Sequence, residues 1–551
     1  MSYGIDLGTS NCLIATVEEN LDGSFEVICL SDDDGNESFP SVVYFEDEHT
    51  YQVGDKALYQ LLHEPDSTVE LIKIRLGKSN EIPVKVKGAR QPILKTPQEV
   101  SSYLLRHFNT LHHGEISEAV LTVPAFFDQN QKDATKQAGQ LAGINIREMI
   151  EEPSAAIMYH LFSQYKEHGI DWFQRRGKRN VLVFDFGGGT LDLSLISVEC
   201  EGEEVKPRVL FVGGDNELGG NIIDFVFVRH ILEYLCLNYR DDGFIQEVKR
   251  AYEDYYDGYI NHKRLRFPAD VSPEIKNFIL RLKRNLENVK IQLSTREETT
   301  IVFERIYAPL RLTRKQFEDV VLKDRKLNVK ARIEAALSQM SRQREVVHEV
   351  LLVGGSAQIP YLSRLITDVL GEMNLDRDHI MTSQEYDKSV VKGAAILGAI
   401  ADGMEIPPFR RNRCRSIVAR DIELQHVKGE PIVFVEKGTE YPFPEKREYI
   451  FNIGHALSET VDLMLNEVIE TPGKASERKP VVDFTFHLPI YYTGDQIRLY
   501  LQINEDGLYQ VEAVHDETNE YVEYEPQRQF SLSEDDFEKV RKQVEQSRDI
   551  T

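Results

Sequence analysis

The sequence predicts an α/β domain built from two related lobes, followed by a small antiparallel β-sandwich and a short C-terminal helix. Short apolar runs alternate with helical patterns from residue 1 to about 403, which is typical of α/β proteins. After about residue 415, apolar and polar residues alternate singly, which is typical of half-buried strands. One glycine-rich turn occurs twice within the α/β part, and this repeat indicates two related lobes.

Length and composition exclude several classes of protein. With 551 residues the chain exceeds the size of a single core, so we expect two or more domains. Apolar residues make up 41% and charged residues 28%, as in ordinary soluble proteins. The net charge of −26 argues against nucleic acid as the main partner. We see neither a run of 18 apolar residues nor an apolar leader, so we expect no membrane-spanning helix, no signal peptide and a cytoplasmic location.

The cysteines are odd in number and lack the spacing of a zinc site or a disulfide framework. We therefore expect reduced thiols, as in a cytoplasmic protein. The five residues are Cys12, Cys29, Cys200, Cys236 and Cys414.

In the α/β part, residues 1–403, the elements can be placed from their patterns. Strands are expected over Val120–Val123, Val181–Asp185, Leu193–Val198 and Val350–Val353, and helices over Gln129–Ala142, Ile275–Leu293 and Val390–Ala401. Ile406–Arg415 breaks the pattern with two prolines and four arginines. Residues 404–414 are therefore predicted to be a linker.

Residues 415–530 are predicted to form the sandwich. Apolar and polar residues alternate in Val482–Leu488 and again in Ile497–Ile503, with Tyr500 on the outer face. A turn at Asn504–Gly507 joins the second strand to Tyr509–Ala513, which predicts an antiparallel hairpin. Residues 531–551 begin with serines followed by acids, which predicts a capped C-terminal helix.

The repeated turn carries the chemistry. Ile5–Ser10 and Phe184–Asp192 share an aspartate at a strand end, then glycine, then threonine. Glycine lets backbone N–H groups approach phosphate oxygens, and the threonine hydroxyl can donate to the same oxygens. Asp6 and Asp185 are placed to hold a hydrated Mg²⁺. Two unrelated glycine hairpins are the alternative, but the shared aspartate and threonine favour a clamp around one triphosphate.

A third glycine element, Val353–Pro360, also follows a strand and opens a helix. Such a turn can pack against a nucleoside, although alone it is more often an ordinary strand-to-helix turn. The chain has no G-x-x-x-x-G-K-[ST] pattern, which excludes a P-loop mechanism.

These motifs resemble the DnaK-type 70-kDa heat-shock chaperone family, whose nucleotide domain belongs to the actin and sugar-kinase superfamily. The resemblance covers nearly the whole chain. It rests on "GIDLGTSN", "VPAFF", "EEPSAA", "FDFGGGTLD", "LGG" at Leu218–Gly220, "LVGGSAQIP" and "KGAA" at Lys392–Ala395. It implies a two-lobe actin-like ATPase that binds ATP or ADP with Mg²⁺, followed by a peptide-binding sandwich.

The resemblance also implies roles for single residues. Lys73, which without it reads as a surface lysine, matches the residue that positions the attacking water, and Glu152 matches the acid that links the nucleotide to the domain interface. Asp192 and Asp387 match further acids of the site, and Pro124 with Lys132 resembles the family's proline switch. The catalytic residues implied are Asp6, Lys73, Glu152, Asp185 and Thr190. The nucleotide contacts implied are Gly8, Thr9, Ser10, Asn11, Gly187, Gly188, Gly189, Gly219, Gly220, Glu287, Lys290, Ser294, Gly354, Gly355, Ser356, Gln358 and Asp387.

Four departures from the family pattern change what is expected. Ile291 and Gln358 stand where the family stacks two arginines on adenine, so adenine should bind more weakly or less selectively. Glu148 reverses the charge of an arginine at the presumed J-domain contact, so a generic J-domain should stimulate poorly. The linker is arginine-rich instead of leucine-rich, so we expect it to couple through an acidic surface and not as an apolar strand. Residues 531–551 are expected to be a truncated lid, with fast peptide exchange.

Three functions fit the sequence to different degrees. The first is a chaperone-like ATPase that couples Mg-ATP to the binding of unfolded or specific polypeptides, with a J-domain protein and an exchange factor as possible partners. The second is a nucleotide-dependent scaffold dedicated to one protein. The third, a metabolic kinase, is disfavoured by the sandwich and by the lack of an evident sugar site.

Overall fold

The structure is a computed structural model, and it describes most of the chain. The described residues are 2–32, 34–78, 81–112, 114–239, 242–260, 267–303, 306–325, 327–341, 345–371, 380–382, 385–425, 431–443, 445–452, 460–469, 476–487, 496–515, 520–523 and 531–551. Within them we find no helix that combines the length and the apolar character needed to cross a membrane. All five cysteines have free thiols, as predicted.

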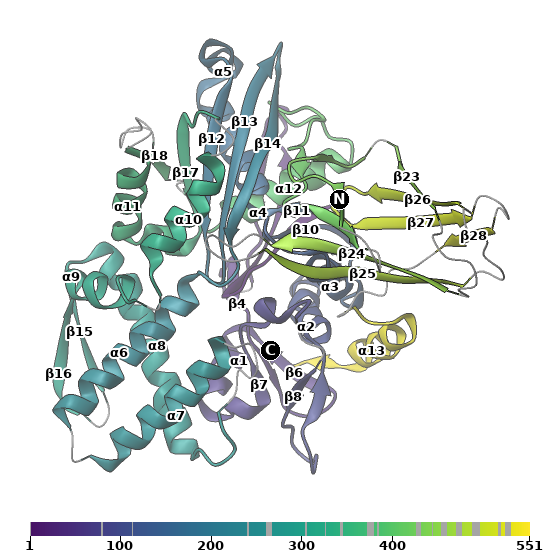
Figure 1. The fold of residues 1–551 in the computed structure, drawn as a ribbon. Helices are drawn as coiled ribbons and strands as arrows, with labels where there is room; N and C mark the ends of the chain where they lie inside the picture. The colour runs from purple at the N-terminus through teal and green to yellow at the C-terminus, as the bar shows by residue number, and fades with distance from the viewer. Residues whose placement is uncertain are drawn as a thin grey trace.

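The first sheet and the helices packed on it form what we call the first unit. Its strand order is β11-β10-β1-β2-β3, and β4 pairs with β2. The strands are β1 (Tyr3–Leu7), β2 (Asn11–Glu19), β3 (Phe25–Cys29), β4 (Ser38–Pro40), β10 (Glu118–Val123) and β11 (Asn145–Glu151). The helices are α2 (Pro97–Leu111) and α3 (Gln129–Leu141), and α3 begins at a capping box on Asp128. Figure 1 shows the unit in purple and blue.

In the second sheet, a glycine turn joins two neighbouring strands in the same way as in the first sheet. Its order is β14-β13-β12-β17-β18. As in the first sheet, a central strand pairs antiparallel with the next strand and parallel with a later one. The strands are β12 (Arg179–Phe186), β13 (Leu191–Glu201), β14 (Glu204–Asp215), β17 (Glu349–Val353) and β18 (Ile380–Thr382). The two phosphate turns therefore connect equivalent strands.

Helices α4 (Glu152–His168) and α12 (Ser389–Ala401) cross between the two sheets. They pack so closely that a Cβ at Gly393 would stand 1.8 Å from the Ala155 carbonyl oxygen. A Cβ at Gly4 in β1 would stand 2.2 Å from the backbone nitrogen of Ala395. No side chain fits at Gly393 or Gly4, so at these two points α12 contacts α4 and β1 through backbone.

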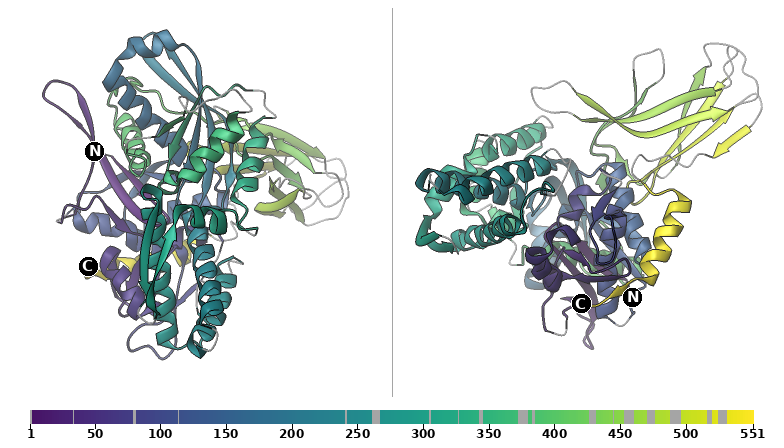
Figure 2. Two further views of the ribbon diagram at one scale, coloured as in Figure 1. Left: turned by 90° about the vertical axis from the view of Figure 1, so that its left-hand side faces the viewer. Right: turned by 90° about the horizontal axis from the view of Figure 1, so that it is seen from below.

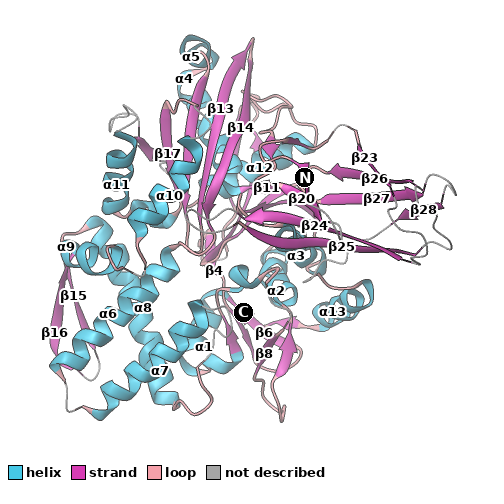
Figure 3. Cartoon of the chain, in the orientation of Figure 1, coloured by secondary structure: helices cyan, strands magenta, loops and turns pink. Residues whose placement is uncertain are grey.

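A helical layer extends from the second sheet beside the cavity described below (Figure 3). It contains α6 (Gly220–Asn238), α7 (Gly243–Ile260), α8 (Pro273–Thr295), α9 (Arg314–Phe317) and the hairpin β15 (Glu298–Phe303) and β16 (Ile306–Thr313). The remaining elements of the α/β part are β5 (Val43–Phe45), β6 (Thr50–Val53), α1 (Gly54–His63), β7 (Thr68–Val69), β8 (Ile82–Val84), β9 (Ile93–Lys95), α5 (Ile170–Arg176), α10 (Val329–Ser341) and α11 (Pro360–Gly371). All predicted strands and helices of this part are confirmed, with ends that differ by a few residues.

The part after residue 415, here called the β region, contains two four-stranded antiparallel sheets ordered β21-β20-β24-β25 and β23-β26-β27-β28. Their strands are β20 (Ile422–Gln425), β21 (Ile432–Val435), β23 (Arg447–Asn452), β24 (Thr460–Ile469), β25 (Glu477–His487), β26 (Gln496–Ile503), β27 (Tyr509–His515) and β28 (Glu520–Glu523). β19 (Ser416–Ile417) and β22 (Glu440–Tyr441) form a short ladder at its base. One apolar core contains residues of both sheets. The predicted hairpin and the outer position of Tyr500 are confirmed.

The predicted linker is a packed segment and not an extended tether. Ile406 and Phe409 are fully buried, and the Pro408 carbonyl oxygen accepts a hydrogen bond from the Val205 amide. Arg415 exchanges backbone hydrogen bonds with Pro207 and Val209 of β14. The segment meets β14 through backbone hydrogen bonds and an isolated bridge between Arg208 and Arg415, while its arginines point to acids, as expected for a segment that does not dock as an apolar strand.

The C-terminal segment, residues 531–551, lies along the first unit (Figure 2). α13 (Glu534–Gln546) is capped by Ser533, as predicted, and packs on α2 and α3. β29 (Arg548–Asp549) then pairs in parallel with β6, so the segment adds a strand to a sheet of the first unit. The segment is therefore packed on the α/β part of the chain in this structure, and its role as a truncated lid stays a prediction.

Candidate nucleotide site

A cavity of about 530 Å³ lies between the two sheets and the helical layer. Most residues predicted to bind nucleotide line it, and the exceptions in the described part of the chain are Gly219 and Asp192. The lining residues that were predicted are Asp6, Gly8, Thr9, Ser10, Asn11, Lys73, Glu152, Asp185, Gly187, Gly188, Gly189, Thr190, Gly220, Glu287, Lys290, Ser294, Gly354, Gly355, Ser356, Gln358 and Asp387.

The two glycine turns face each other across the cavity. A Cβ on Gly188 would stand 2.4 Å from the Ser10 hydroxyl oxygen, and one on Gly189 would stand 2.5 Å from the Thr9 hydroxyl oxygen. Gly219 lies behind this pair, with its Cβ position 2.5 Å from the Gly189 carbonyl carbon. The two turns thus approach each other with no room for a side chain at Gly188 or Gly189, and because both line the cavity, their backbone N–H groups and hydroxyls can contact a phosphate chain from two sides.

Four acids and one lysine gather at the phosphate end of the cavity. Lys73 is 4% exposed and forms an ion pair with Glu152, so the reading as a surface lysine is wrong. Burial raises the pKa of Glu152 to about 7, against the opposing charge of Lys73. Burial and the neighbouring carboxylates raise the pKa of Asp185 well above its ordinary value, and burial raises that of Asp192.

This arrangement fits a Mg-nucleotide. The Asp6 carboxylate accepts a 2.6 Å hydrogen bond from the Thr122 hydroxyl, which fixes it beside the first turn. Buried carboxylates whose pKa values are raised by burial and mutual repulsion favour a nearby cation, which relieves the repulsion. Asp6 and Asp185 precede the glycines of the two turns, line the cavity and are the residues that would hold hydrated Mg²⁺.

The end of the cavity where the base of a nucleotide is expected, here called the base end, is formed by α8 and the third glycine turn. Lys290 forms a 2.7 Å ion pair with Asp224 of α6. Ile291 is 59% exposed at the rim, where it offers only aliphatic contact. Ser356 donates a 2.9 Å hydrogen bond to the Gly187 carbonyl oxygen and so joins the third turn to the second phosphate turn.

Several lining residues were not predicted, notably Asn221, Asp224 and Arg296. Asn221 and Asp224 lie three residues apart at the start of α6, directly after the "LGG" motif, so helical spacing after a predicted turn was the signal that would have found them. Arg296 follows the end of α8 and carried no such signal.

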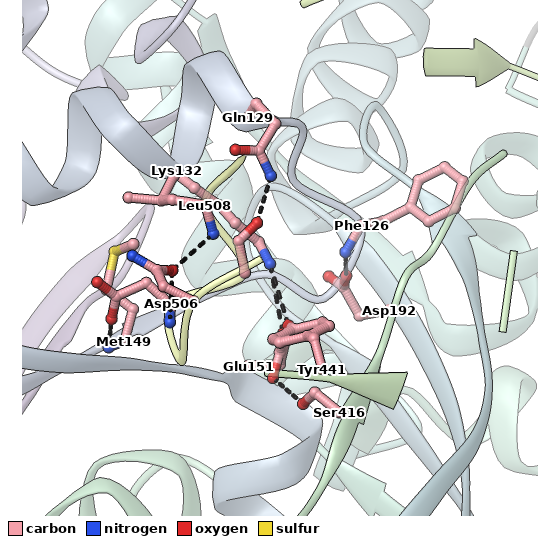
Figure 4. Close-up of polar contacts among 12 residues, drawn as sticks. Phe126, Gln129, Lys132, Met149, Glu151, Asp192, Ser416, Tyr441, Asp506 and Leu508 are labelled. Atoms are coloured by element: carbon pink, nitrogen blue, oxygen red, sulfur yellow. Dashed lines mark hydrogen bonds and ion pairs between the residues drawn. The ribbon is translucent and has the colours of Figure 1, made fainter. Parts of the chain in front are cut away.

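The β region contacts the first unit beside this site through polar groups (Figure 4). Glu151, which directly precedes Glu152, is 9% exposed and accepts hydrogen bonds from Tyr441 and Ser416 of the β region. The Lys132 ammonium lies 3.4 Å from the Glu151 carboxylate and 3.3 Å from the Tyr441 hydroxyl. A residue that belongs to the interface therefore adjoins a residue of the nucleotide site.

A second contact is made by the turn between β26 and β27. Asp506 accepts a 2.8 Å hydrogen bond from the Met149 amide and pairs with Lys136. Gln129 donates to the Gly507 carbonyl oxygen and accepts from the Tyr509 amide at 3.1 Å. All of these partners in the first unit lie on α3 or β11.

Glu148 does not present a free negative charge on this surface. Glu148 is 7% exposed, and its carboxylate lies 2.6 Å from the guanidinium of Arg413 in the predicted linker, residues 404–414, which we call the connecting segment. The Arg413 guanidinium also lies 2.7 Å from the carboxylate of Glu505. Burial raises the pKa of Glu148 to about 7, although Arg413 opposes this shift. The predicted contact of linker arginines with acids is present at this pair and at Arg410 with Glu203, and coupling through these contacts stays a prediction.

A family model described as Hsp70 protein matches residues 2–251 and 260–550. The chain belongs to the Hsp70 family. Among curated relatives, the protein named Chaperone protein DnaK of Thermosipho melanesiensis is 32% identical over 73% of this chain and 59% of its own length. The DnaK proteins of Thermoplasma volcanium and Mycoplasmopsis agalactiae are each 28% identical over 98% and 99% of this chain and over 80% and 82% of their own lengths. The alignment with the first of these relatives thus spans less than two thirds of that protein.

Both phosphate turns, Lys73 and Glu152 lie around one cavity, as the resemblance implies. Ile291 and Gln358 also line this cavity. That they replace the family's stacking arginines, and so change the nucleotide preference, stays a prediction.

Proposed function

We propose that the chain is a two-lobe actin-like ATPase whose nucleotide state controls peptide binding by a C-terminal β-sandwich. As a member of the Hsp70 family it is an ATP-dependent molecular chaperone and an ATP hydrolase. The proposed parts are residues 1–403, the connecting segment 404–414, the sandwich 415–530 and the C-terminal helix 531–551. The observation that carries the proposal is the pair of glycine turns that face each other across one cavity.

The chemistry follows from the charges at the phosphate end. Thr9, Thr190 and the backbone of both turns orient the phosphates, and Lys73 lies where it can orient the attacking water and offset charge on the transferring phosphoryl group. Glu152 holds Lys73 in place through their ion pair. Mg²⁺, when bound near Asp6 and Asp185, supplies further positive charge for the phosphates. Little covalent chemistry is required of the protein, since phosphoryl transfer depends mainly on positioning and charge.

The client is proposed to be a polypeptide held by the β region. A strand edge with apolar pockets can bind an extended peptide by adding it as a strand. A J-domain protein and a nucleotide-exchange factor are further proposed partners, and poor stimulation by a generic J-domain stays a prediction at Glu148. The alternative of a dedicated scaffold is not favoured, because the named relatives are chaperones.

The substitution Lys73→Ala tests the ATPase assignment. ATP should still bind, while turnover should fall by about 100-fold or more, because the lysine acts mainly on the attacking water and the transferring group. The matched control is Lys87→Ala, whose side chain is 62% exposed on the first unit. Turnover by Lys73→Ala equal to that of the unmodified protein would contradict the assignment.

The base end has its own test. Because Ile291 offers no guanidinium plane, we expect a small preference for ATP over GTP, and Ile291→Arg should strengthen ATP binding by roughly 2- to 20-fold. Titration of both nucleotides by calorimetry measures the effect. A strong preference for ATP in the unmodified protein would show that other residues, such as Arg296, recognise adenine.

A further inference from the structure

Tyr386 brings an aromatic ring to the nucleotide cavity. Among the described residues that line the cavity, no other is aromatic. Tyr386 lies at the base end, where its carbonyl oxygen accepts a 3.0 Å hydrogen bond from the Gly354 amide of the third glycine turn. Its side chain is half-buried, and burial raises the pKa of the phenol. An aromatic ring in this place offers a flat surface on which a base can stack.

The turn that carries Tyr386 is held by its neighbours. The Glu385 carbonyl oxygen accepts a 2.9 Å hydrogen bond from the Lys388 amide, and the Glu385 carboxylate forms a 2.6 Å ion pair with Lys392 of α12. The Lys388 side chain forms an ion pair with Glu37, which precedes β4 of the first unit. Because these contacts fix the turn on two sides, little further ordering of the backbone is needed when a base stacks on the ring.

Arg296 contributes a guanidinium to the same end of the cavity from another element. It directly follows α8, and its amide donates a 2.8 Å hydrogen bond to the Gln292 carbonyl oxygen. Its side chain is exposed, and within the described part of the chain we find no ion pair for it. The two other cations that line the cavity, Lys73 and Lys290, are both paired with acids. A guanidinium without a carboxylate partner can lie against the face of a base.

The polar side chains of the base end are bonded to the protein. The Ser294 and Thr295 hydroxyls donate to backbone carbonyl oxygens of α8 at 3.1 and 3.2 Å. The Gln358 side chain forms a hydrogen bond with the Tyr386 phenol. These groups lose a contact if they turn to the hydrogen-bonding edge of a base, whereas a flat face accepts adenine and guanine alike.

We propose that Tyr386 and Arg296 hold the base of the nucleotide, which stacks on the Tyr386 ring and lies against the Arg296 guanidinium. The site then selects purine over pyrimidine nucleotides and accepts GTP as well as ATP. The selection follows from area, because the fused rings of a purine cover more of a flat surface than the single ring of a pyrimidine. This inference rests on the proposed ATPase function and names the class of its substrates.

Calorimetry of Mg-nucleotide binding to the full chain tests the role of Tyr386. The dissociation constants of ATP and GTP should agree within about threefold, and CTP and UTP should bind at least about tenfold more weakly. Tyr386→Leu should weaken the binding of ATP and GTP by about tenfold each, whereas Tyr386→Phe keeps the ring and should bind both as the unmodified protein does. The matched control is Tyr234→Leu, whose residue is 45% exposed on α6 and does not line the cavity.

Arg296 is tested separately, because its side chain is exposed and its replacement leaves the core unchanged. Arg296→Lys keeps the charge and removes the guanidinium plane, so Arg296→Lys and Arg296→Gln should both weaken ATP and GTP by about threefold. Arg311→Gln, whose side chain is 69% exposed on β16, is the control. Normal binding by Arg296→Lys together with weak binding by Arg296→Gln would mean that charge alone acts, and would overturn the proposed contact with the base.

Mg-tripolyphosphate has the phosphate chain without a base and separates a base contact from a general loss of the site. It should bind Tyr386→Leu and the unmodified protein equally, and weaker binding by the variant would overturn the inference. The inference also fails, with the ATPase assignment intact, if Tyr386→Leu binds ATP as tightly as the unmodified protein or if CTP binds as tightly as ATP. If Tyr386→Leu does not fold, the Arg296 variants and the comparison of ATP with CTP decide. If no nucleotide binds at all, the proposed function and the inference both fail.

Discussion

Two parts of the chain contact the first unit, and their interfaces differ in chemistry. The β region meets it mainly through charged and hydroxyl groups, such as Glu151, Lys132 and Tyr441, with Leu508 as an apolar contact. The C-terminal segment meets it mainly through buried apolar residues of α13, among them Val544, and through the strand β29, with one buried pair between Asp549 and His107.

The difference indicates which contact is able to release. Polar partners exchange their hydrogen bonds with water at little net free energy, whereas separating buried apolar surfaces exposes groups that form no hydrogen bonds with water. We therefore expect the β region to be the mobile partner and the C-terminal segment to be a fixed one. The following changes test that distinction, from the largest expected effect to the smallest.

The largest effect is expected at the charge pair that joins the connecting segment to the first unit. Glu148→Arg places like charge against Arg413 in a buried position and should weaken docking of the β region by about 3 kcal/mol. Hydrogen exchange at the Met149 amide, which donates to Asp506, reports docking. The exchanged pair Glu148→Arg with Arg413→Glu should recover most of the protection, and failure to recover would show that charge is not the cause.

The C-terminal segment should stay bound to the first unit unless the pairing of its strand β29 is lost. Arg548→Pro with Ile550→Pro removes the two amides that donate to His49 at 2.7 Å and to Tyr51 at 3.0 Å, and should cost about 2 kcal/mol of stability. Arg548→Ala with Ile550→Ala keeps both amides and is the matched control. Thermal unfolding measures the difference. Equal melting temperatures for the two variants would mean that the strand contributes nothing.

A single hydroxyl tests the polar interface. Tyr441→Phe removes a hydrogen bond to the buried Glu151 and should weaken docking by about 1.5 kcal/mol. Tyr500→Phe removes an exposed hydroxyl of the same region and should have no effect. If both variants dock equally, the Glu151 contact is not a determinant of docking.

The smallest effect is the response of docking to pH. The pKa of Glu148 is about 7 when docked, above its ordinary value of 4.5, because burial outweighs Arg413 while Glu505 and Asp506 add negative charge. The docked state thus binds a proton that the exposed carboxyl releases, so docking gains about 1 kcal/mol below pH 7 and loses this as pH rises through 7. Met149 exchange at pH 6 and pH 8 measures it, and Glu148→Gln should abolish the difference.

The phosphate end of the site could be predicted from the sequence because its signals are local. One residue separates Asp6 from Gly8 and Asp185 from Gly187, and a strand that ends in such a turn fits few other structures. Lys73 carried no such local signal, and only the resemblance identified it. Its burial depends on Glu152, 79 residues later.

The contacts among the parts could not be predicted, for a related reason. Arg413 and Glu148 are 265 residues apart, and nothing near either residue marks the other as its partner. Strand β29 has two residues, too few for any period to be visible. The arginine-rich composition of the connecting segment gave no sign that Phe409 is buried, because composition describes a segment as a whole and does not show which of its residues face the protein interior.

At the crossing of α4 and α12 between the two sheets, the two helices touch through backbone at Gly393. Because a Cβ at Gly393 would collide with Ala155, even alanine is excluded from this position. Any side chain here would push α12 away from α4, and with it the sheet that each helix supports. The spacing of the two phosphate turns, which belong to those two sheets, therefore depends on a residue that does not line the cavity.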